Sequence, residues 1–262
     1  MANPPLIIGH RGASARAPEN TMAAFRLAIE QGADGVEFDV RLTRDGVPVV
    51  IHDGDLKRTG GCKDRVSDLS LAQLKKVDVG SWFKRASFPQ ERVPTLEEVF
   101  QLFESTNHVL YLEMKSNPNE RAVLARTCCE FLRNSSLKSR VIVECFDLLG
   151  IESVKNIAED VKTAALFEPK IRHLSVFRIN GRIIKQALAV EADEIALHHR
   201  LATSRTIQAA RNSNLKVVVW TVDKPKWIHK TLSNQVTALI TNDPLVLARQ
   251  RDVEAQALIR VE

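Results

Sequence analysis

Short apolar runs alternate with helical patterns along most of the chain. From residue 94 onwards, each apolar run precedes a segment whose apolar residues recur three and four positions apart. Eight strands separated by helices, with no break in composition, predict an α/β fold, a single-domain (β/α)8 TIM barrel over 1–262. An open doubly wound sheet is the alternative. The strands are predicted at 109–114, 141–145, 163–167, 194–197, 217–222 and 238–241, with two more beginning near Leu6 and Val36.

Two helix starts carry capping residues. Thr95 precedes an apolar segment and Glu98 follows three residues later, which is the pattern of a capping box. Asn20 or Thr21 can cap the helix predicted over 22–29, and Gly32 ends that helix.

A β-hairpin is predicted between residues 35 and 53. The dipeptide Asp45-Gly46 separates two apolar runs, and it favours a two-residue turn because both central positions reach positive φ. A turn over 44–47 pairs residues whose numbers sum to 91, so Asp39 is expected opposite His52. Glu37 lies on the same face of the strand as Asp39, since strand side chains alternate.

The hairpin therefore predicts two carboxylates beside an imidazole. Ionised carboxylates at short range repel each other, and a divalent cation relieves that repulsion. This favours a metal site on Glu37 and Asp39, with His52 next to it. A solvated edge hairpin is the alternative, and the return strand over 47–52 is not one of the eight barrel strands because it runs antiparallel.

Residues 54–95 break the alternation and are interpreted as a small insertion above the scaffold, after the His52 hairpin. They contain Gly60-Gly61, mixed charges and an apolar pair, Trp82-Phe83. Connections of this length in compact domains are often lids or binding loops. A tolerated surface loop is the alternative.

Polar residues collect where the predicted strands end. In a TIM barrel the carboxyl ends of the strands form the active-site face, so these side chains are expected to converge. Charge inside a strand requires a partner or a metal. Glu113 and Lys115 could be only an ion pair, and Trp220 could be core filling, but we assign Trp220 to substrate binding. The converging residues are His10, Arg11, Glu37, Asp39, His52, Glu113 and Lys115, and Trp220 lies near the end of its strand.

Charge and composition limit the classes of molecule that the protein is expected to bind. The 262 residues carry a net charge of +5 without a run of Lys or Arg, and only 5% are aromatic. Nucleic acid is therefore not expected, because base stacking needs aromatic platforms. An anionic small molecule is the preferred substrate class, and an uninformative basic surface is the alternative.

Cysteine usage and the N-terminus favour a cytoplasmic protein. The four cysteines show no CxxC spacing and are expected to be reduced thiols. The first residues lack the basic and apolar regions of a signal peptide. No apolar run reaches the ~18 residues of a transmembrane helix.

Eight short motifs, in order along nearly the whole chain, resemble the glycerophosphodiester phosphodiesterase family. Each motif alone is weak, but the ordered set is specific. They are Gly9-His10-Arg11-Gly12, Pro18-Glu19-Asn20-Thr21, Glu37-Phe38-Asp39-Val40, Thr43-Arg44-Asp45-Gly46, His52-Asp53, Pro94-Thr95-Leu96, Glu113-Met114-Lys115 and Trp220-Thr221-Val222.

The resemblance implies a TIM barrel with a small insertion, and it implies a divalent metal, Mg2+ or Ca2+. The metal is expected on Glu37, Asp39 and Glu113. The resemblance also makes His10 and His52 the general acid and base. Arg11 and Lys115 then correspond to the residues that hold the phosphate.

Two departures from the family pattern are visible. Cys145-Phe146 stands where Ser-Phe is frequent, and Thr241-Asn242-Asp243-Pro244 stands where Thr-Asp-x-Pro is usual. Both lie outside the expected catalytic set, so they bear on substrate fit and on hydrogen bonding at the rim.

The expected activity is metal-dependent hydrolysis of glycerophosphodiesters to sn-glycerol 3-phosphate and an alcohol. The nucleophile is either water or the glycerol 2-hydroxyl. One alternative is a lysophospholipase D, for which Trp82, Phe83 and Phe88 could line an acyl channel. A barrel that binds phosphodiesters without turnover is the other alternative, and the intact set of polar residues argues against it.

Overall fold

Eight parallel strands form a closed barrel in the computed structural model, which describes residues 4–85, 88, 90–115, 117–169 and 176–259. β1 pairs with both β2 and β9, which closes the ring and confirms the predicted TIM barrel. The barrel strands are β1 (Leu6–His10), β2 (Gly35–Leu42), β4 (Val109–Met114), β5 (Val141–Cys145), β6 (Lys162–Phe167), β7 (Glu194–His198), β8 (Lys216–Trp220) and β9 (Ala238–Thr241), while β3 (Pro48–Val50) pairs antiparallel with β2.

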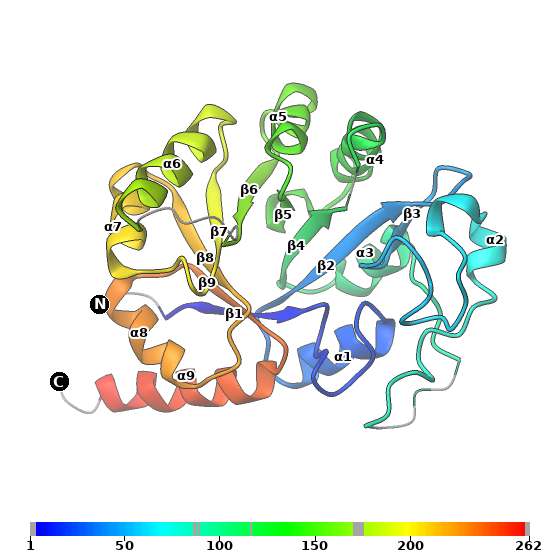
Figure 1. Cartoon of the computed structure of the whole chain (residues 1–262). Helices are drawn as coiled ribbons and strands as arrows, with labels where there is room; N and C mark the ends of the chain where they lie inside the picture. The colour runs from blue at the N-terminus through cyan, green and yellow to red at the C-terminus, as the bar shows by residue number, and fades with distance from the viewer. Residues whose placement is uncertain (1–3, 86–87, 89, 116, 170–175, 260–262) are drawn as a thin grey trace.

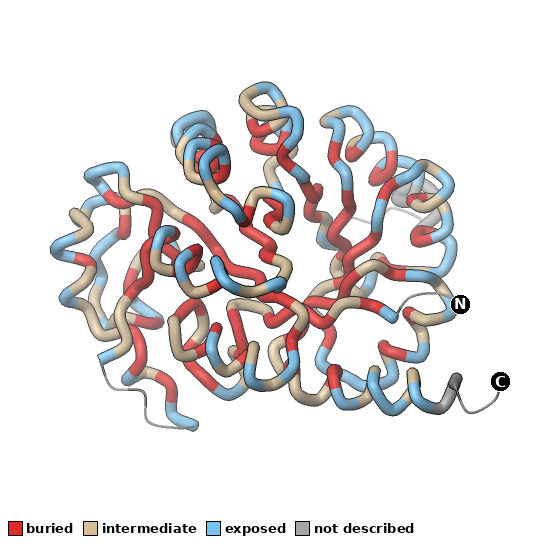
Figure 2. The backbone as a smooth tube through the Cα atoms, turned by 180° about the vertical axis from the view of Figure 1, so that it is seen from behind, coloured by how far each residue is buried: buried red, intermediate tan, exposed pale blue. Residues whose placement is uncertain are grey.

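Helices surround the barrel (Figure 1). Buried positions concentrate on the strands, and exposed positions lie along the outer sides of the helices (Figure 2). No helix in the described part of the chain is both long and apolar enough to cross a membrane. The helices are α1 (Met22–Glu30), α2 (Leu71–Leu74), α3 (Leu96–Phe103), α4 (Arg121–Arg133), α5 (Leu148–Ile157), α6 (Val176–Ala189), α7 (Ser204–Asn212), α8 (Lys226–Asn234) and α9 (Pro244–Ile259), with 3-10 turns η1 (Val66–Asp68) and η2 (Lys138–Arg140).

The alternation of β2 separates packing from chemistry. Val36 and Phe38 belong to the hydrophobic layer between strands and helices, where the Phe38 ring meets the Phe25 ring of α1 edge to face at 6.0 Å. Glu37 and Asp39 alternate with them and therefore project into the barrel. The apolar residues fix the strand against the helices, and this orients the two carboxylates inward.

The hairpin register differs by one residue from the prediction. Val40 lies opposite Val50, so paired positions sum to 90 and not 91. Asp39 is therefore opposite Ile51, whose N–H donates to the Asp39 carbonyl at 2.9 Å. His52 follows this last pair and is free of the ladder, so its side chain turns to the barrel mouth.

The reason for the shift is the turn. Thr43 N–H donates to the Val47 carbonyl, which leaves three residues in the loop in place of two. Gly46 has a positive φ of 79°, and Asp45 does not share this conformation. A three-residue loop with glycine in the left-handed region is the next most common hairpin connection after the two-residue turns. Asp45 instead accepts a hydrogen bond from the Thr43 hydroxyl at 2.7 Å.

The two predicted helix starts are confirmed. Thr95 and Glu98 form a full capping box at α3. Thr21, and not Asn20, caps α1 through its side chain. Asn20 is thereby free to reach the barrel, where its amide donates to the Asp39 carboxylate at 2.7 Å.

The 54–95 segment packs on its own small hydrophobic cluster beside the barrel. Residues 86, 87 and 89 of this segment lie outside the described residues. Trp82, Phe83 and Phe88 contact one another edge to face, with neighbouring ring centroids 5.8 and 5.9 Å apart. The cluster also includes residues of the hairpin, which ties the segment to the strand that leads to His52. Its buried members are Val49, Ile51, Leu56, Val66, Leu74, Val79 and Val93.

Candidate active site

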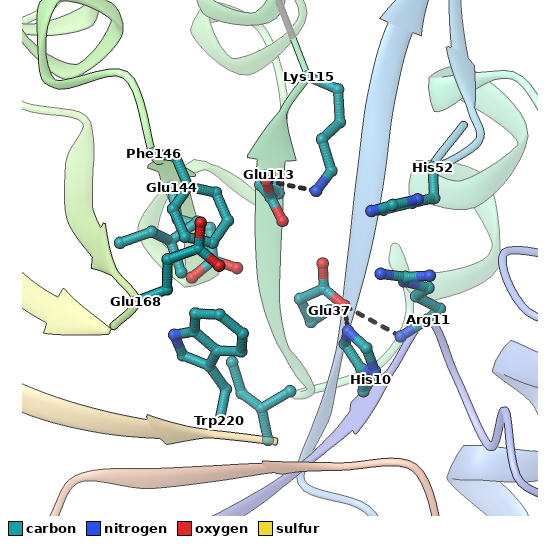
Figure 3. A pocket seen from close by; sticks show the side chains of 12 residues that line it. His10, Arg11, Glu37, His52, Glu113, Lys115, Glu144, Phe146, Glu168 and Trp220 are labelled. Carbon is teal, nitrogen blue, oxygen red and sulfur yellow. Dashed lines mark hydrogen bonds and ion pairs between the residues drawn. The ribbon is translucent and has the colours of Figure 1, made fainter. Parts of the chain in front are cut away.

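A pocket of about 530 Å³, its open mouth included, lies at the carboxyl end of the barrel. Every residue predicted for the site lines this pocket except Asp39 (Figure 3). The Asp39 carboxylate instead pairs with two of the lining residues, Arg11 and Lys115. Sequence reasoning did not assign Glu144, Phe146, Leu166, Glu168 or Ile240 to the pocket. The complete lining is His10, Arg11, Glu37, His52, Glu113, Lys115, Glu144, Phe146, Leu166, Glu168, Trp220 and Ile240.

Strand register brings three glutamates together in the pocket. Asp39 of β2 is level with Glu113 of β4, and Glu113 is level with Glu144 of β5. One carboxylate oxygen from each of Glu37, Glu113 and Glu144 lies within 4.8 Å of the others. All three side chains are buried.

Burial and mutual repulsion raise the pKa values of these glutamates. Burial raises the pKa of Glu37 well above its ordinary value, and Asp39 and Glu113 add to the rise. The pKa of Glu113 rises to about 7, again mainly through burial. Glu37 Oε1 and Glu144 Oε2 are buried without a hydrogen-bond partner among the described residues. Buried acidic oxygens without partners are costly unless a cation or a proton satisfies them.

Asp39 is held differently, by cations. Arg11 Nε lies 3.1 Å from Asp39 Oδ2, and Lys115 Nζ lies 3.1 Å from Asp39 Oδ1. Burial acts to raise the pKa of Asp39, but Lys115 and Arg11 outweigh it and hold the pKa below its usual range. Lys115 also contacts Glu113 at 2.6 Å. The structure thus brings Glu37 and Glu113 together with Glu144, and it places Asp39 beside the two predicted phosphate-binding cations.

His10 sits at the end of β1 with a neutral partner. Its Nδ1 lies 2.7 Å from Asn242 Oδ1. The Asn242 amide donates to Asp223 at 2.9 Å and its oxygen accepts from Ser14, so the oxygen faces the imidazole. His10 Nδ1 therefore carries the proton, and Nε2 is left as an acceptor 3.8 Å from Glu37. Burial, with help from Arg11, lowers the pKa of His10 to about 4.

His52 has a charged partner. Its Nδ1 donates to Asp53 Oδ1 at 2.7 Å, so its Nε2 is also free for proton transfer. The ring points into the pocket between Lys115 and Arg11 (Figure 3). Burial lowers the pKa of His52, while Asp39 and Asp53 act in the opposite direction.

The outer wall of the pocket is aromatic. Trp220 Nε1 donates to the Ala196 carbonyl at 3.1 Å, which fixes the indole. The Phe146 ring meets Trp220 edge to face at 5.5 Å. Phe146 is 39% exposed, a large fraction for such a ring, so this wall offers apolar surface to whatever enters the pocket.

Glu144 was the main residue missed in the sequence. It is the fourth residue of a strand that was predicted correctly, and it follows the same inward alternation as Glu113. That alternation was the available signal. Asn242 and Asp53 belong to motifs that were noted, but their hydrogen bonds to the histidines depend on loop geometry.

The fold and this pocket define a class of protein. A TIM barrel with acidic oxygens, two imidazoles with free Nε2 atoms and two cations at its carboxyl rim is a hydrolase suited to an anionic ester. The comparisons with known proteins make the assignment more specific.

The family model of the glycerophosphoryl diester phosphodiesterase family matches residues 10–246, and the chain belongs to this family. It is 32% identical over 244 residues to the glycerophosphodiester phosphodiesterase of Caldanaerobacter subterraneus, covering 92% of this chain and 96% of that one.

Solved structures agree with this assignment. A phosphodiesterase from Oleispira antarctica, solved in complex with the product sn-glycerol-3-phosphate, is 25% identical and superposes with a TM-score of 0.83 over 95% of this chain and 97% of that one. A structure from Silicibacter pomeroyi is 24% identical, with a TM-score of 0.85 over 96% of this chain and 94% of that one, and supports the fold.

Proposed function

We propose that this protein hydrolyses glycerophosphodiesters to sn-glycerol 3-phosphate and an alcohol. The observation that carries the proposal is the convergence of His10, His52, Arg11 and Lys115 on one pocket with buried glutamates. Family membership supports the same reaction, as does the product bound to the Oleispira antarctica relative.

Arg11 and Lys115 are proposed to bind the phosphodiester. Both flank the pocket, and both are paired with Asp39 on its inner side. Fixed cations lower the barrier to phosphoryl transfer because they neutralise charge that builds on the phosphoryl oxygens. Asp39 keeps the two cations in place before substrate arrives, so little reorganisation is needed when the phosphate binds.

His10 and His52 are proposed as the acid–base pair. Each presents Nε2 to the pocket and has Nδ1 engaged by a hydrogen bond. One accepts a proton from the nucleophile and the other protonates the leaving alkoxide, and each such group contributes roughly 10²–10⁴ in rate. The nucleophile is water or the glycerol 2-hydroxyl. A transient cyclic glycerophosphate would identify the hydroxyl route, and incorporation of solvent oxygen without that intermediate would exclude it.

A divalent ion, Mg2+ or Ca2+, is proposed on Glu37, Asp39 and Glu113. Glu37 Oε1 and Glu144 Oε2, which are buried without a hydrogen-bond partner among the described residues, fit such an ion. The raised pKa values of Glu37 and Glu113 fit it as well, since oxygen donors suit hard cations. Glu144 stands close enough to add a further oxygen. When bound, the ion supplies Lewis-acid stabilisation of a phosphoryl oxygen.

The lysophospholipase D alternative gains no support from the 54–95 segment. Trp82, Phe83 and Phe88 pack against one another, and Phe83 is 8% exposed. None of the three lines the pocket. These three rings therefore anchor the segment and do not line an acyl channel.

The cysteines bear on the compartment. Cys62, Cys128, Cys129 and Cys145 are all free thiols, which suits the reducing cytoplasm that we infer.

The test is release of sn-glycerol 3-phosphate from glycerophosphocholine and glycerophosphoethanolamine. It is run with EDTA, then with Mg2+ or Ca2+ restored, and with His10→Ala as the control. Metal-restored release that the variant lacks is expected. Folded protein that releases no product with either metal would refute the proposal, and a higher rate on lysophosphatidylcholine would favour the lysolipid activity.

A further inference from the structure

We propose that Arg58 is a positioning residue that holds His52 and Arg11 in their working orientations. Arg58 lies in the 54–95 segment and does not line the active-site pocket. It acts through two carboxylates, Asp53 and Glu19. The inference rests on the proposed function, which gives His52 and Arg11 their roles.

The first branch runs to His52. Arg58 Nε donates to Asp53 Oδ2 at 2.7 Å, and Asp53 Oδ1 accepts from His52 Nδ1 at 2.7 Å. The two oxygens of one carboxylate are thus divided between the guanidinium and the imidazole. Asp53 is only partly buried, at 26% exposed, so a second contact is needed to prevent its carboxylate from turning to solvent.

The second branch runs to Arg11. Arg58 Nη1 and Nη2 donate to the two oxygens of Glu19, each at 2.7 Å, in a bidentate pair. Glu19 Oε1 also accepts from Arg11 Nη1 at 2.8 Å. A bidentate pair fixes the plane of the carboxylate, and this in turn fixes the direction of the Arg11 donor.

Arg58 itself is held by the 54–95 segment. The neighbouring Leu56 and Thr59 are buried, and Leu56 belongs to the hydrophobic cluster of the segment. The guanidinium carbon lies 5.6 Å from the centre of the Trp82 ring, whose Nε1 donates to the Val79 carbonyl. The core of the segment therefore sets the position of the guanidinium. This gives residues 54–95 a role in catalysis without a residue in the pocket.

The geometry explains why the fork of arginine is required. Three N–H groups reach three carboxylate oxygens on two separate loops at the same time. A lysine ammonium keeps the charge but cannot reproduce this planar arrangement. Lys57 is the matched control, because it is adjacent, pairs with Asp55 and has a side chain that is 61% exposed.

The experiment compares Arg58→Ala, Arg58→Lys and Lys57→Ala in the 262-residue chain. For Arg58→Ala we expect kcat on glycerophosphocholine to fall roughly 10-fold to 100-fold, the scale of a small misplacement of catalytic groups. Guanidinium ion added to Arg58→Ala should restore part of that loss. Arg58→Lys should be intermediate, and Lys57→Ala should match the parent protein.

A second readout separates positioning from stability and from turnover. The His52 tautomer is measured by ¹H–¹⁵N NMR of histidine-labelled protein, with His52→Gln to assign the signal. Arg58→Ala should lose the fixed Nδ1–H form, while Lys57→Ala keeps it. The proposal is overturned by Arg58→Ala turning over within twofold of the parent protein, or by an unchanged tautomer. Should Arg58→Ala fail to fold, parent-like kcat and tautomer in Arg58→Lys would overturn it equally. No turnover by the parent protein would refute the proposed function, whereas the NMR result tests Arg58 independently.

Discussion

His10 and His52 reach the same pocket from two differently built regions. His10 ends a barrel strand, and its Nδ1 faces the neutral amide of Asn242. His52 follows a hairpin outside the barrel, and its Nδ1 faces the carboxylate of Asp53, which Arg58 holds in turn. Both supports leave Nε2 free. Only one of them places a negative charge beside the imidazole.

The difference suggests how the work is divided. A carboxylate behind an imidazole stabilises the protonated ring, as in serine hydrolases. A neutral amide does so more weakly, because it carries no charge. The hydrogen bond to Asn242 acts to raise the pKa of His10, but burial outweighs it and lowers that pKa to about 4. We therefore infer that His52 donates the proton to the leaving alkoxide and His10 accepts the proton of the nucleophile.

Removing either imidazole should have the largest effect on kcat, and it tests which histidine is the acid and which is the base. His10→Gln and His52→Gln should each lower kcat on glycerophosphocholine by roughly 10²–10⁴, the contribution of one acid or base. The two should differ when p-nitrophenol replaces choline, because that leaving group needs no proton. His52→Gln should then lose much less, while His10→Gln loses as much as before. Equal losses by both variants on both esters would contradict the assignment.

The next largest fall in kcat is expected when the Asp53 carboxylate, the charged partner of His52, is made neutral. Asp53→Asn keeps the shape of the side chain but removes the carboxylate that faces His52. We expect kcat to fall roughly 10-fold to 100-fold, the usual cost of losing the partner that orients a functional histidine. Asp55→Asn is the control, since Asp55 pairs with exposed Lys57 and not with a histidine. An Asp53→Asn variant as fast as Asp55→Asn would mean that the charge does not matter.

These supports also mark where sequence reasoning ended. The barrel and its rim residues were predictable because strand alternation and parallel order bring Glu37 and Glu113 to one end. Glu144 follows the same alternation, but its place beside Glu113 depends on register between strands, which the sequence does not state. The one-residue shift of the hairpin depended on which of Asp45 and Gly46 adopts positive φ.

Long-range hydrogen bonds were beyond reach for a related reason. Asn242 is 232 residues from His10 along the chain, and Arg58 is 39 residues from Glu19. Such contacts are set by how loops fold over the finished barrel. Local propensity and periodicity carry no information about them.

Exchanging the neutral support for a charged one should make His10 resemble His52. Asn242→Asp alone would set two carboxylates against each other, because Asn242 donates to Asp223. The double variant Asn242→Asp/Asp223→Asn swaps the amide and the carboxylate and keeps the hydrogen bond. A nearby carboxylate favours the charged imidazole, so the pKa of His10 should rise by about one unit.

The measurement is the pH profile of kcat/KM. His10 must be neutral to accept a proton, so the acidic limb should move to higher pH in the double variant. Asp223→Asn alone is the control and should leave the limb in place. If the acidic limb does not move in the double variant, a group other than His10 sets that limb.

The smallest expected effect is on stability, and it follows from the burial of His10. The pKa of His10 is about 4 in the folded protein, against an ordinary value of 6.5. Between these values the unfolded chain binds a proton that the folded protein does not, so stability falls as pH falls from 6.5 to 4. His10→Gln removes this dependence. Relative to the parent protein, the variant should therefore gain free energy of unfolding on acidification, by about 1–2 kcal/mol, since one pKa unit corresponds to about 1.4 kcal/mol and His10 is partly exposed.

Urea unfolding at pH 7 and pH 4.5, with metal removed, measures the difference. His229→Gln serves as the control, because the His229 side chain is 89% exposed and makes no part of the pocket. The gain should be specific to His10→Gln. If both variants respond to pH alike, the barrel does not hold His10 neutral, and the contrast between the two supports would then lie in geometry alone and not in charge.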